Sequence, residues 1–492
     1  MADTGGEQLA LVPPELSSTT SKARATRSST TAALSTTNPV ARVVIDTPLA
    51  HLDRLFEYAV LAQDDAQARP GVRVRVRFAG RDHDGFITSR ISEAEHPGAL
   101  TPIRRVVSDE PVLTPHILAV CRAVADHYAG TLSDMLRLAI PPRHAAAERE
   151  VAPANSQLAA TPPAEAGGAT FAGAAQAWAR YPAGAALLNR LAAGESPRAS
   201  LLGLPSQPKG ADWPDAIAQA VAATSASGRG SLIVVPDHRD VERVSAALES
   251  TLGVDSFVAL TADLGPGARY RAWLAVLRGH HAVVVGTRAA AYAPILKPGL
   301  FVLWDDADDT HREQRAPYPH VREVLRARAD NAGAALLVAG FGRSAEVSAW
   351  VGEGTVRSVH AATATVREQM PVITVAGEGH QGARDQAARS ARMPSRAWQA
   401  LSQGLNRGPV LIQVPRRGYV MGLHCARCRH RLDCPSCHGP AHMTALAEEA
   451  RCQWCGQAIP AAACPECGAL DRRGSVIGEQ RTAYEIGRAF PG

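Results

Sequence analysis

Eight of the nine cysteines of this 492-residue chain lie in one short block. They form four Cys-x-x-Cys pairs: Cys425/Cys428, Cys434/Cys437, Cys452/Cys455 and Cys464/Cys467. Each pair places two thiolates on one side of a turn, and tetrahedral zinc needs two such turns. The four pairs therefore predict two zinc ions, each held by four cysteines. Because every ligand is a thiolate, both sites are expected to be structural rather than catalytic.

A cluster of disulfides is the alternative interpretation of these pairs. The N-terminal residues lack the apolar segment of a secretory signal, and the chain has no run of apolar residues long enough to cross a membrane. These features predict a cytoplasmic protein, whose thiols stay reduced, so zinc is favoured. The ninth cysteine, Cys121, falls in a helical pattern and is interpreted as a buried, inert thiol.

The composition is that of a globular chain of several domains, with 46% hydrophobic residues and a formal net charge of +5. A surplus this small does not establish nucleic-acid binding, so the distribution of cations matters more. Residues 1–39 are rich in Ser, Thr and Ala and are predicted to be a disordered tail. Residues 40–143 are predicted to form a β-rich domain closed by helices. Its predicted strands cover 42–47, 72–78, 85–87 and 103–107, and its helices 114–128 and 131–139.

Residues 144–196 are predicted to be a linker and a short, winged-helix-like helical region. Beyond it, apolar strands alternate with helices, which predicts a parallel sheet covered on both faces. The predicted strands are 231–235, 282–286, 300–304 and 335–339, with helices at 214–226, 239–252, 266–278 and 319–330.

These elements predict a first lobe over 197–362 in a multidomain α/β protein. A further strand at 409–414 predicts the first part of a second lobe over 363–423. The cysteine-rich insert, 424–468, interrupts this lobe, which continues over 469–492.

Gly203 to Gly210 (GLPSQPKG) stand where a phosphate-binding loop, GxxxxGK[ST], is expected. Lys209 is in register with the motif's lysine, but Pro208 replaces its second glycine and Gly210 its hydroxyl residue. A proline has no backbone N–H to offer a phosphate, and magnesium loses its side-chain ligand. An ordinary loop is therefore favoured over a nucleotide site.

An acidic loop containing Asp305 and Asp306 follows the predicted strand 300–304. A carboxylate pair at this position can hold magnesium when a phosphate loop faces it. Without that loop, a solvated acidic loop is the favoured interpretation.

Basic and aromatic residues gather in the N-terminal domain. Arg73 and Arg75 alternate with valines along the predicted strand 72–78, so they share one face. A solvated strand face is one interpretation, but cations near aromatic residues such as Phe56 are also typical of single-strand recognition. In the first lobe, Arg288 directly follows a strand end, where it and backbone N–H groups suit one phosphate of a nucleic acid.

Together these motifs resemble the PriA family of replication restart proteins, also called primosomal protein N′, and in particular its helicase-degenerate form from high-GC bacteria. The resemblance begins near residue 40 and continues to the end of the chain. It rests on the four cysteine pairs and on LFEY (55–58), GVRVRV (71–76), YAGTLSDMLRLAIPP (128–142), GTRAAAYAP (286–294) and RRGY (416–419).

The resemblance implies an N-terminal domain that binds the 3′ end of a nascent leading strand. Phe56 and Glu57 would form the family's aromatic–acidic pair, and Arg104 its basic contact. The lobes would be degenerate RecA-like helicase lobes with parallel sheets. It also implies that the outer cysteine pairs share one zinc and the inner pairs the other, a choice that spacing leaves open. The first site would be Cys425, Cys428, Cys464 and Cys467; the second would be Cys434, Cys437, Cys452 and Cys455.

The chain departs from the family's helicase motifs. Besides the decayed phosphate loop, the DEEH tetrad reads Asp305-Asp306-Ala307-Asp308, and Gly340 to Arg343 (GFGR) replace a Ser-Ala-Thr motif. The chain is expected to be C-terminally truncated relative to the family, because it ends at Gly492 before the later strands of the second lobe. Whether a nucleotide is still bound at Lys209, Asp305 and Asp306 is left open.

The function that this resemblance implies is recognition of abandoned or stalled replication forks, with help in primosome assembly and in reloading the replicative helicase. No ATPase or helicase activity is expected. The expected partners are forked DNA, single-stranded 3′ ends, primosome proteins, the replicative helicase and single-stranded DNA-binding protein, in a nucleoid-associated protein without membrane contact. The alternatives are an active ATP-dependent 3′→5′ helicase and a zinc-ribbon interaction module without a DNA role.

Overall fold

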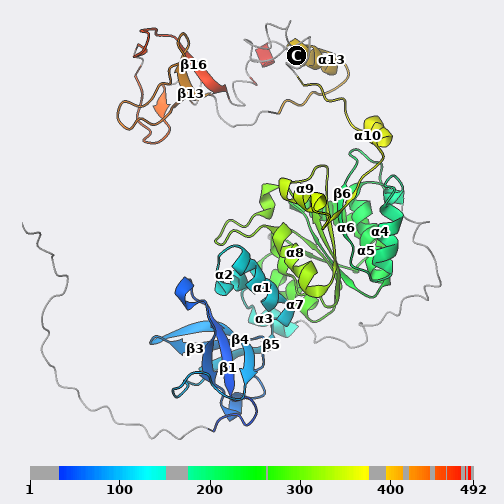
Figure 1. Ribbon diagram of the computed structural model, residues 1–492, viewed down its shortest axis with the longest axis vertical. Helices are drawn as coiled ribbons and strands as arrows, with labels where there is room; N and C mark the ends of the chain where they lie inside the picture. Colours follow the sequence, from blue (N-terminus) through cyan, green and yellow to red (C-terminus); the bar gives the residue numbers. More distant parts are fainter. Residues whose placement is uncertain are drawn as a thin grey trace, which may run out of the picture. The chain divides into compact units, whose positions relative to one another are not determined.

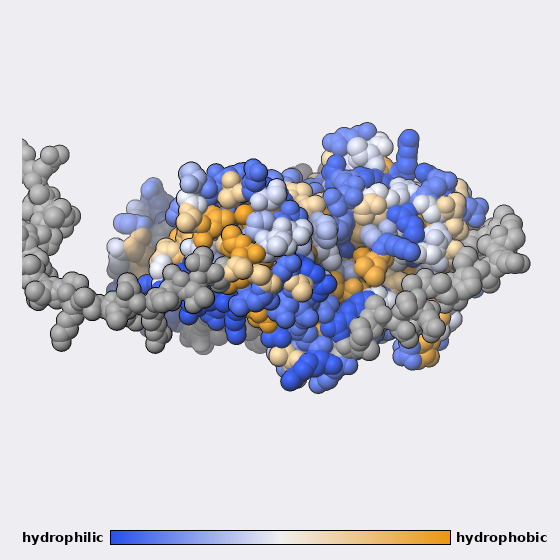
Figure 2. All heavy atoms as spheres, turned by 90° about the horizontal axis from the view of Figure 1, so that it is seen from below, coloured by the Kyte–Doolittle hydropathy of each residue, from blue (hydrophilic) through white to orange (hydrophobic). Residues whose placement is uncertain are grey.

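The computed structural model describes residues 33–150, 176–261, 264–375, 395–413, 420–443, 449–460, 463–477, 483 and 486–488. The chain divides into two compact units, Met1–Pro371 and Val372–Gly492, and each is described by itself. In the described residues, no helix has both the length and the apolar character to cross a membrane. On the face drawn in Figure 2, hydrophobic residues gather in small groups among hydrophilic ones.

The first unit begins with an antiparallel sheet in the order β2-β1-β4-β3-β5 (Figure 1). Its strands are β1 (Val40–Ile45), β2 (Phe56–Ala59), β3 (Val72–Phe78), β4 (Arg81–Ile91) and β5 (Arg105–Pro111), with short 3-10 helices η1 (Ala50–Leu52) and η2 (Ala62–Asp64). The residues just before β5 pair with β2, because Ile103 N donates to the Ala59 carbonyl. The sheet therefore curls into a barrel, called the N-terminal barrel below (residues 40–111). Val72, Val74 and Val76 are fully buried inside it, as their alternation predicted.

The end of the predicted tail, residues 33–39, contacts the barrel. Ser35 is buried, and its backbone N donates to the Val60 carbonyl over 2.9 Å. The Arg90 guanidinium donates to the Thr37 carbonyl over 2.6 Å and to Asp65 over 2.7 Å. Residues 33–39 are thus bound to the barrel, so the tail prediction is wrong for them, and residues 1–32 lie outside the described residues.

Two helices follow the barrel as predicted, α1 (Pro115–His127) and α2 (Leu132–Ala139). A third helix, α3 (Ala145–Glu150), lies where the sequence predicted a linker, so the linker prediction is wrong for these residues. Threonines start the first two, since Thr114 accepts from Ile117 N and Thr131 from Asp134 N. Cys121 on α1 is fully buried, and burial raises its thiol pKa to about 12. Its interpretation as a buried thiol is confirmed.

A seven-stranded sheet in the order β12-β6-β11-β10-β7-β9-β8 forms the first lobe, and the neighbouring strands run parallel. The strands are β6 (Arg198–Leu202), β7 (Gly230–Val234), β8 (Val258–Leu260), β9 (Val283–Gly286), β10 (Pro298–Trp304), β11 (Ala335–Gly340) and β12 (Arg357–Val359). The four predicted strands are confirmed as β7, β9, β10 and β11. The other three are short or lie near the sheet edge.

Helices cover both faces of this sheet (Figure 1). One face packs against α1 and α2, together with α7 (Pro266–Leu277), α8 (Val321–Ala332) and α9 (Ala345–Gly352). The other packs against α4 (Gly184–Ala192), α5 (Trp213–Ala226) and α6 (His238–Leu252). Further short elements are η4 (Gln176–Trp178), η5 (Arg288–Tyr292), η6 (Asp309–His311) and α10 (Thr363–Gln369).

The short helical region predicted within 144–196 is not a domain of its own. Trp178 is buried, and its indole N–H donates to the Ala216 carbonyl of α5 over 2.9 Å. Leu188 and Leu191 of α4 lie in the same apolar core. The described part of this region is therefore a layer of the first lobe, and residues 151–175 lie outside the described residues.

The second unit contains α13 (Ser395–Leu405) and an antiparallel sheet in the order β15-β14-β13-β16. The strands are β13 (Val420–Cys425), β14 (Ala441–Met443), β15 (Arg451–Cys452) and β16 (Arg472–Ile477). The strand predicted at 409–414 is wrong for residues 409–413, which are exposed and form no strand; residue 414 lies outside the described residues. The described residues of 420–477 are called the cysteine-rich knob below.

Candidate functional site

The four cysteine pairs of the knob share one backbone conformation. In each turn, the N–H of the residue after the second cysteine donates to the carbonyl of the first, as Arg429 N does to Cys425. That residue is left-handed in all four turns, with φ of 67° at Arg429, 57° at His438, 72° at Gly456 and 69° at Gly468. The repeated turn directs both thiols of a pair to the same side, which a metal site requires.

The eight thiols form two groups, and within each group the sulfur atoms lie within 4.8 Å of one another. One group is Cys425, Cys428, Cys464 and Cys467; the other is Cys434, Cys437, Cys452 and Cys455. The Sγ atoms of Cys425 and Cys467 are 3.5 Å apart, and those of Cys434 and Cys455 are 3.7 Å apart. Tetrahedral zinc with bonds of about 2.3 Å separates its sulfurs by about 3.8 Å. The groups therefore fit two zinc ions, in the nested arrangement that the resemblance implied.

Backbone N–H groups favour the thiolate form that a metal needs. The N–H of Cys428 lowers the pKa of the Cys425 thiol to about 6. The N–H of Cys455 does the same for Cys452, whose pKa is also about 6. Both effects come from the turn itself, whereas burial and the neighbouring thiols raise the pKa of Cys428 and of Cys437 to about 12. The backbone of the turns therefore favours the thiolate at Cys425 and Cys452 in particular.

A second candidate site is a pocket of about 690 Å³ on the N-terminal barrel, called the Phe56 pocket. Phe56 meets Phe78 at an angle of 61°, with ring centroids 4.7 Å apart. The Arg54 guanidinium lies 4.9 Å from the Phe56 ring centroid. The lining residues are Arg42, Arg54, Leu55, Phe56, Glu57, Tyr58, Arg77, Phe78, Ala79, Glu95, His96, Ala99, Leu100 and Thr101. Aromatic rings beside cations suit a nucleobase and its phosphate.

Glu57 supplies a carboxylate to the pocket, and only 9% of its side chain is exposed. Its Oε2 accepts backbone hydrogen bonds from Glu95 over 2.9 Å and from His96 over 3.0 Å, whereas its Oε1 has a long contact of 3.5 Å to Arg42 Nε. Burial by itself raises the pKa of Glu57, but these backbone bonds and Arg42 outweigh it and hold the pKa below its usual value. The group is therefore an anion whose Oε1 can accept a further hydrogen bond.

The structure does not bring all predicted DNA-contact residues to this pocket. Arg104 Nε is 2.9 Å from Asp82, and Arg75 Nε is 3.6 Å from Asp84, so carboxylates accompany both cations. Arg73 lies over the Phe86 ring and donates to the Pro141 carbonyl over 2.6 Å. Arg73 thus packs between the barrel and the segment after α2, apart from the Phe56 pocket.

The pocket residues that were not identified from the sequence include Arg42, Arg54 and His96. Arg42 is paired directly with Glu57 across β1 and β2. The strand pattern around residue 42 could have indicated that Arg42 lies beside Glu57, but only if β2 had been assigned and its register with β1 had been known. Arg54 immediately precedes the LFEY motif. His96 comes from a loop that carries no recognisable sequence signal.

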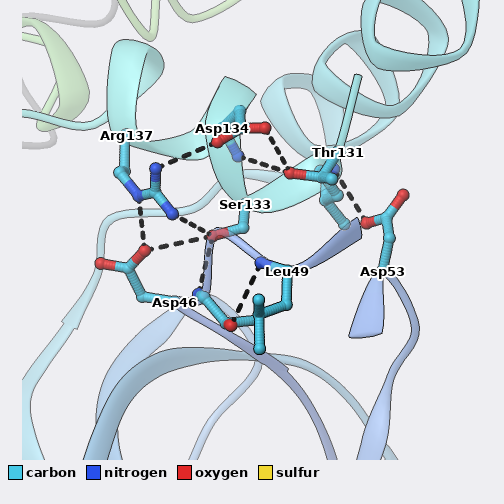
Figure 3. A network of polar contacts seen from close by, with 9 residues as sticks. Asp46, Leu49, Asp53, Thr131, Ser133, Asp134 and Arg137 are labelled. Carbon is cyan, nitrogen blue, oxygen red and sulfur yellow. Dashed lines mark hydrogen bonds and ion pairs between the residues drawn. The ribbon is translucent and has the colours of Figure 1, made fainter. Parts of the chain in front are cut away.

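The segment that leads into the Phe56 pocket is attached to the start of α2 (Figure 3). The Asp46 carboxylate accepts from Arg137 Nε over 2.6 Å and from the Ser133 hydroxyl over 3.1 Å. Asp53 accepts from the backbone N of Leu132 over 2.9 Å, which caps the helix. These contacts fix both ends of residues 46–53, and Arg54 and Phe56 follow immediately.

Arg288 lies in a separate cleft of about 860 Å³, called the Arg288 cleft. The cleft lies beyond the carboxyl ends of β7, β9 and β10, and α2 contributes to its wall. Arg288 donates to the Thr310 carbonyl over 2.7 Å and to Glu313 over 3.1 Å. The basic residues of the lining are Arg137, His238, Arg269, Arg288 and Arg315; the acidic ones are Asp237 and Glu313. A lining with more cations than anions suits a phosphate backbone.

The loop that contains Lys209 gives its N–H groups to the protein's own carboxylates. Asp215 Oδ2 accepts from Gly210 N over 2.9 Å and from Asp212 N over 3.2 Å. These donors stand at the N-terminus of α5, where a nucleotide-binding loop would hold phosphate. Lys209 itself is exposed.

The neighbouring aromatic and acidic residues are also engaged. Trp304, at the end of β10, stacks on Trp213 with ring centroids 4.0 Å apart. Asp306 is 1% exposed, and its Oδ2 is 3.3 Å from Arg322 Nη1, so the prediction of a solvated loop is wrong for Asp306. Burial, together with Asp308 and Asp306, raises the pKa of Asp305. Asp306 is thus paired with a buried arginine.

Comparisons with known proteins identify a related domain and several relatives. Residues 42–141 match a family model described as the 3′ DNA-binding domain (3′BD) of PriA. The probable replication restart protein PriA of Mycobacterium tuberculosis is 46% identical over 444 residues, which cover 90% of this chain and 66% of that protein. Its counterpart in Mycobacterium leprae is 44% identical over 447 residues, 90% of this chain and 67% of the relative. PriA of Treponema pallidum is 23% identical over 464 residues, which cover 92% of this chain and 66% of that protein.

This chain therefore spans about two thirds of the length of these relatives. Among solved structures, the crystal structure of the helicase MrfA aligns with 47% of this chain and 40% of its own chain, at 13% identity and a TM-score of 0.26. The matches to the mycobacterial proteins each cover 90% of this chain. The chain belongs to the PriA family of replication restart proteins.

Proposed function

We propose that this protein captures the 3′ end of a DNA strand at abandoned or stalled replication forks and assists primosome assembly and reloading of the replicative helicase. The observation that carries the proposal is the Phe56 pocket, within the region that matches the 3′ DNA-binding domain. A terminal base stacks on Phe56, and the 3′-hydroxyl donates to Glu57 Oε1. A 3′-phosphate would meet the Glu57 anion instead, so the pocket selects a free 3′ end.

The Arg288 cleft adds a second, sequence-independent contact with the DNA backbone. Its cations hold phosphates by charge, so their contribution falls as salt rises. The knob, with its two zinc ions, presents a rigid surface to DNA or to other proteins of the primosome. Forked DNA, primosome proteins, the replicative helicase and single-stranded DNA-binding protein are the proposed partners.

The salt dependence of single-strand binding tests the role of the cleft. Replacing Arg288 with glutamine is expected to make the slope of log affinity against log salt shallower by about 0.7, the value for one phosphate contact on a single strand. Fluorescence anisotropy of a labelled oligonucleotide at several salt concentrations measures it. Arg190→Gln is the matched control, because Arg190 lies on α4, outside the cleft lining, and pairs with Glu195 just beyond the end of that helix. Equal slopes for the wild type and Arg288→Gln would remove Arg288 from the interface.

We also propose that the first lobe does not turn over ATP. The N–H groups at the start of α5 are bonded to Asp215, Asp306 is paired with Arg322, and Pro208 offers no N–H. A phosphate that enters must displace Asp215, and a magnesium ion must separate a buried ion pair, which costs several kcal/mol.

Hydrolysis of radiolabelled ATP in the presence of forked DNA tests this proposal. The wild type is expected to release phosphate at the rate of the protein-free background, and Lys209→Ala is expected to do the same. Turnover well above background in the wild type that disappears in Lys209→Ala would contradict the proposal. That result would favour the alternative, an active ATP-dependent 3′→5′ helicase.

A further inference from the structure

The cysteine-rich knob exposes one aromatic side chain, Trp454. Among the described knob residues, Trp454 and Leu470 are the large hydrophobic side chains that stay exposed, each with 70% of its surface accessible. Trp454 lies between two ligands of the same metal group, Cys452 and Cys455. Neither the paired thiols nor the small apolar core of the knob requires an indole at this position, so its exposure calls for another explanation.

The backbone holds this indole in a fixed place. Trp454 N donates to Cys452 Sγ over 3.4 Å, and Gln453 N donates to the Pro440 carbonyl over 2.9 Å. The ring lies against Gly439, where a Cβ would come within 2.9 Å of indole Cδ2 and 3.0 Å of Cε3. Only glycine leaves room for the ring there. The indole thus rests on backbone while most of its surface meets solvent, and the metal that joins the two turns fixes their geometry.

A cation accompanies the ring on the same turn. Arg451 is exposed, and its Nη1 donates to the Gly456 carbonyl over 3.3 Å, so its side chain folds back along the turn that contains Trp454. A flat aromatic surface with an arginine beside it is the arrangement that holds an unpaired base and its phosphate.

We propose that Trp454 is a stacking platform for an unpaired nucleobase and that Arg451 contacts the adjoining phosphate. The proposal rests on the DNA-binding function proposed above and assigns the single strand to a defined place on the knob. The surroundings favour a base over a protein partner. Gln453, Gln457 and Gly456 around the indole are exposed, and the other exposed large hydrophobic residue, Leu470, belongs to the turn of the other metal group. Protein-binding hot spots are instead surrounded by contacts that exclude water.

The test uses the full, zinc-loaded chain and a labelled oligothymidylate whose 3′ end carries a phosphate, so that the Phe56 pocket does not contribute. Trp454→Ala is expected to weaken binding at least about fivefold, the usual effect of removing one stacking residue, and Trp454→Phe to restore part of the loss. Arg451→Gln is expected to make the salt slope shallower by about 0.7, whereas Trp454→Ala leaves the slope unchanged. Leu470→Ala is the matched control and binds as the wild type does. Zinc content confirms that every variant keeps two ions.

Equal affinity of the wild type and Trp454→Ala, both with two zinc ions, would overturn the stacking role and leave the indole as a site for a protein. If the wild type bound the free-ended oligonucleotide but not the blocked one, this inference would fail while 3′-end capture survived. If it bound neither, both proposals would fail.

Discussion

Replacing Cys434 with serine is expected to remove the zinc ion of the group Cys434, Cys437, Cys452 and Cys455, which leaves one ion on the purified chain, and to unfold the part of the cysteine-rich knob around that group. The apolar core of the knob is small: the buried residues besides Cys434 and Cys452 are Leu423, Ala441, Ala450 and Ile459. Such a core cannot offset the conformational entropy of the segment. Binding of a structural zinc ion contributes about 10–16 kcal/mol in small peptides at neutral pH, so the metal supplies most of the folding free energy.

Elemental mass spectrometry gives the metal content, and hydrogen exchange gives the stability of each part of the chain. Amide protection is expected to be lost in the described residues around this group, 432–443 and 449–459, while the N-terminal barrel keeps its protection. Ser436→Ala is the matched control, because Ser436 lies in the same turn and its contact with Cys434 Sγ comes from the backbone N–H. Unchanged protection of the knob after removal of metal with a chelator would show that zinc is not structural.

The second large effect is expected at the Phe56 pocket. Phe56→Ala should weaken binding of an oligonucleotide with a free 3′ end by about 5- to 100-fold, because one base–aromatic stack is lost. Binding of the same oligonucleotide with a 3′-phosphate should change little. Fluorescence anisotropy with the two oligonucleotides measures both affinities.

Glu57→Gln keeps the shape of the side chain and removes its charge, so it separates recognition from folding. This variant should lose much of the preference for a 3′-hydroxyl over a 3′-phosphate, since the phosphate no longer meets an anion. Thermal unfolding shows whether the barrel remains folded in both variants. If Phe56→Ala, folded, weakened the free and the blocked oligonucleotide equally, the pocket would be a general contact rather than an end-binding site.

The elements with strong sequence periodicity could be predicted. Val72, Val74 and Val76 alternate with arginines, and this pattern identified the interior of the barrel. The long apolar strands of the first lobe were equally clear, because strands buried on both faces leave continuous hydrophobic runs. The three strands of the first lobe that were not predicted, β6, β8 and β12, are five residues or shorter, and so short a run carries little periodic signal.

Recognition of the cysteine pairs needed only composition and spacing, but their grouping did not follow from spacing. Nested and interleaved arrangements use the same four turns, and tertiary packing decides between them. The Phe56 pocket shows the same limit. Its aromatic–acidic pair is visible in the sequence, whereas His96 reaches Glu57 from a loop 39 residues away.

The environment of charged groups was the least predictable feature. Asp306 has the sequence surroundings of a solvated acidic loop, yet it pairs with Arg322 on α8, which lies 16 residues further along the chain. Arg73 has the strand position of an exposed cation, yet it packs over Phe86 and against the segment after α2. Burial of a charge depends on which elements meet in space, and a local pattern does not record that.

We propose that this protein selects forks by a free 3′ end. Fluorescence anisotropy of the wild-type chain with two forks, identical except that one leading-strand 3′ end carries a phosphate, measures that selection. The wild type is expected to bind the fork with the free hydroxyl more tightly, and Glu57→Gln is expected to lose that preference. Equal affinity of the wild type for both forks would show that the protein does not recognise the free 3′ end.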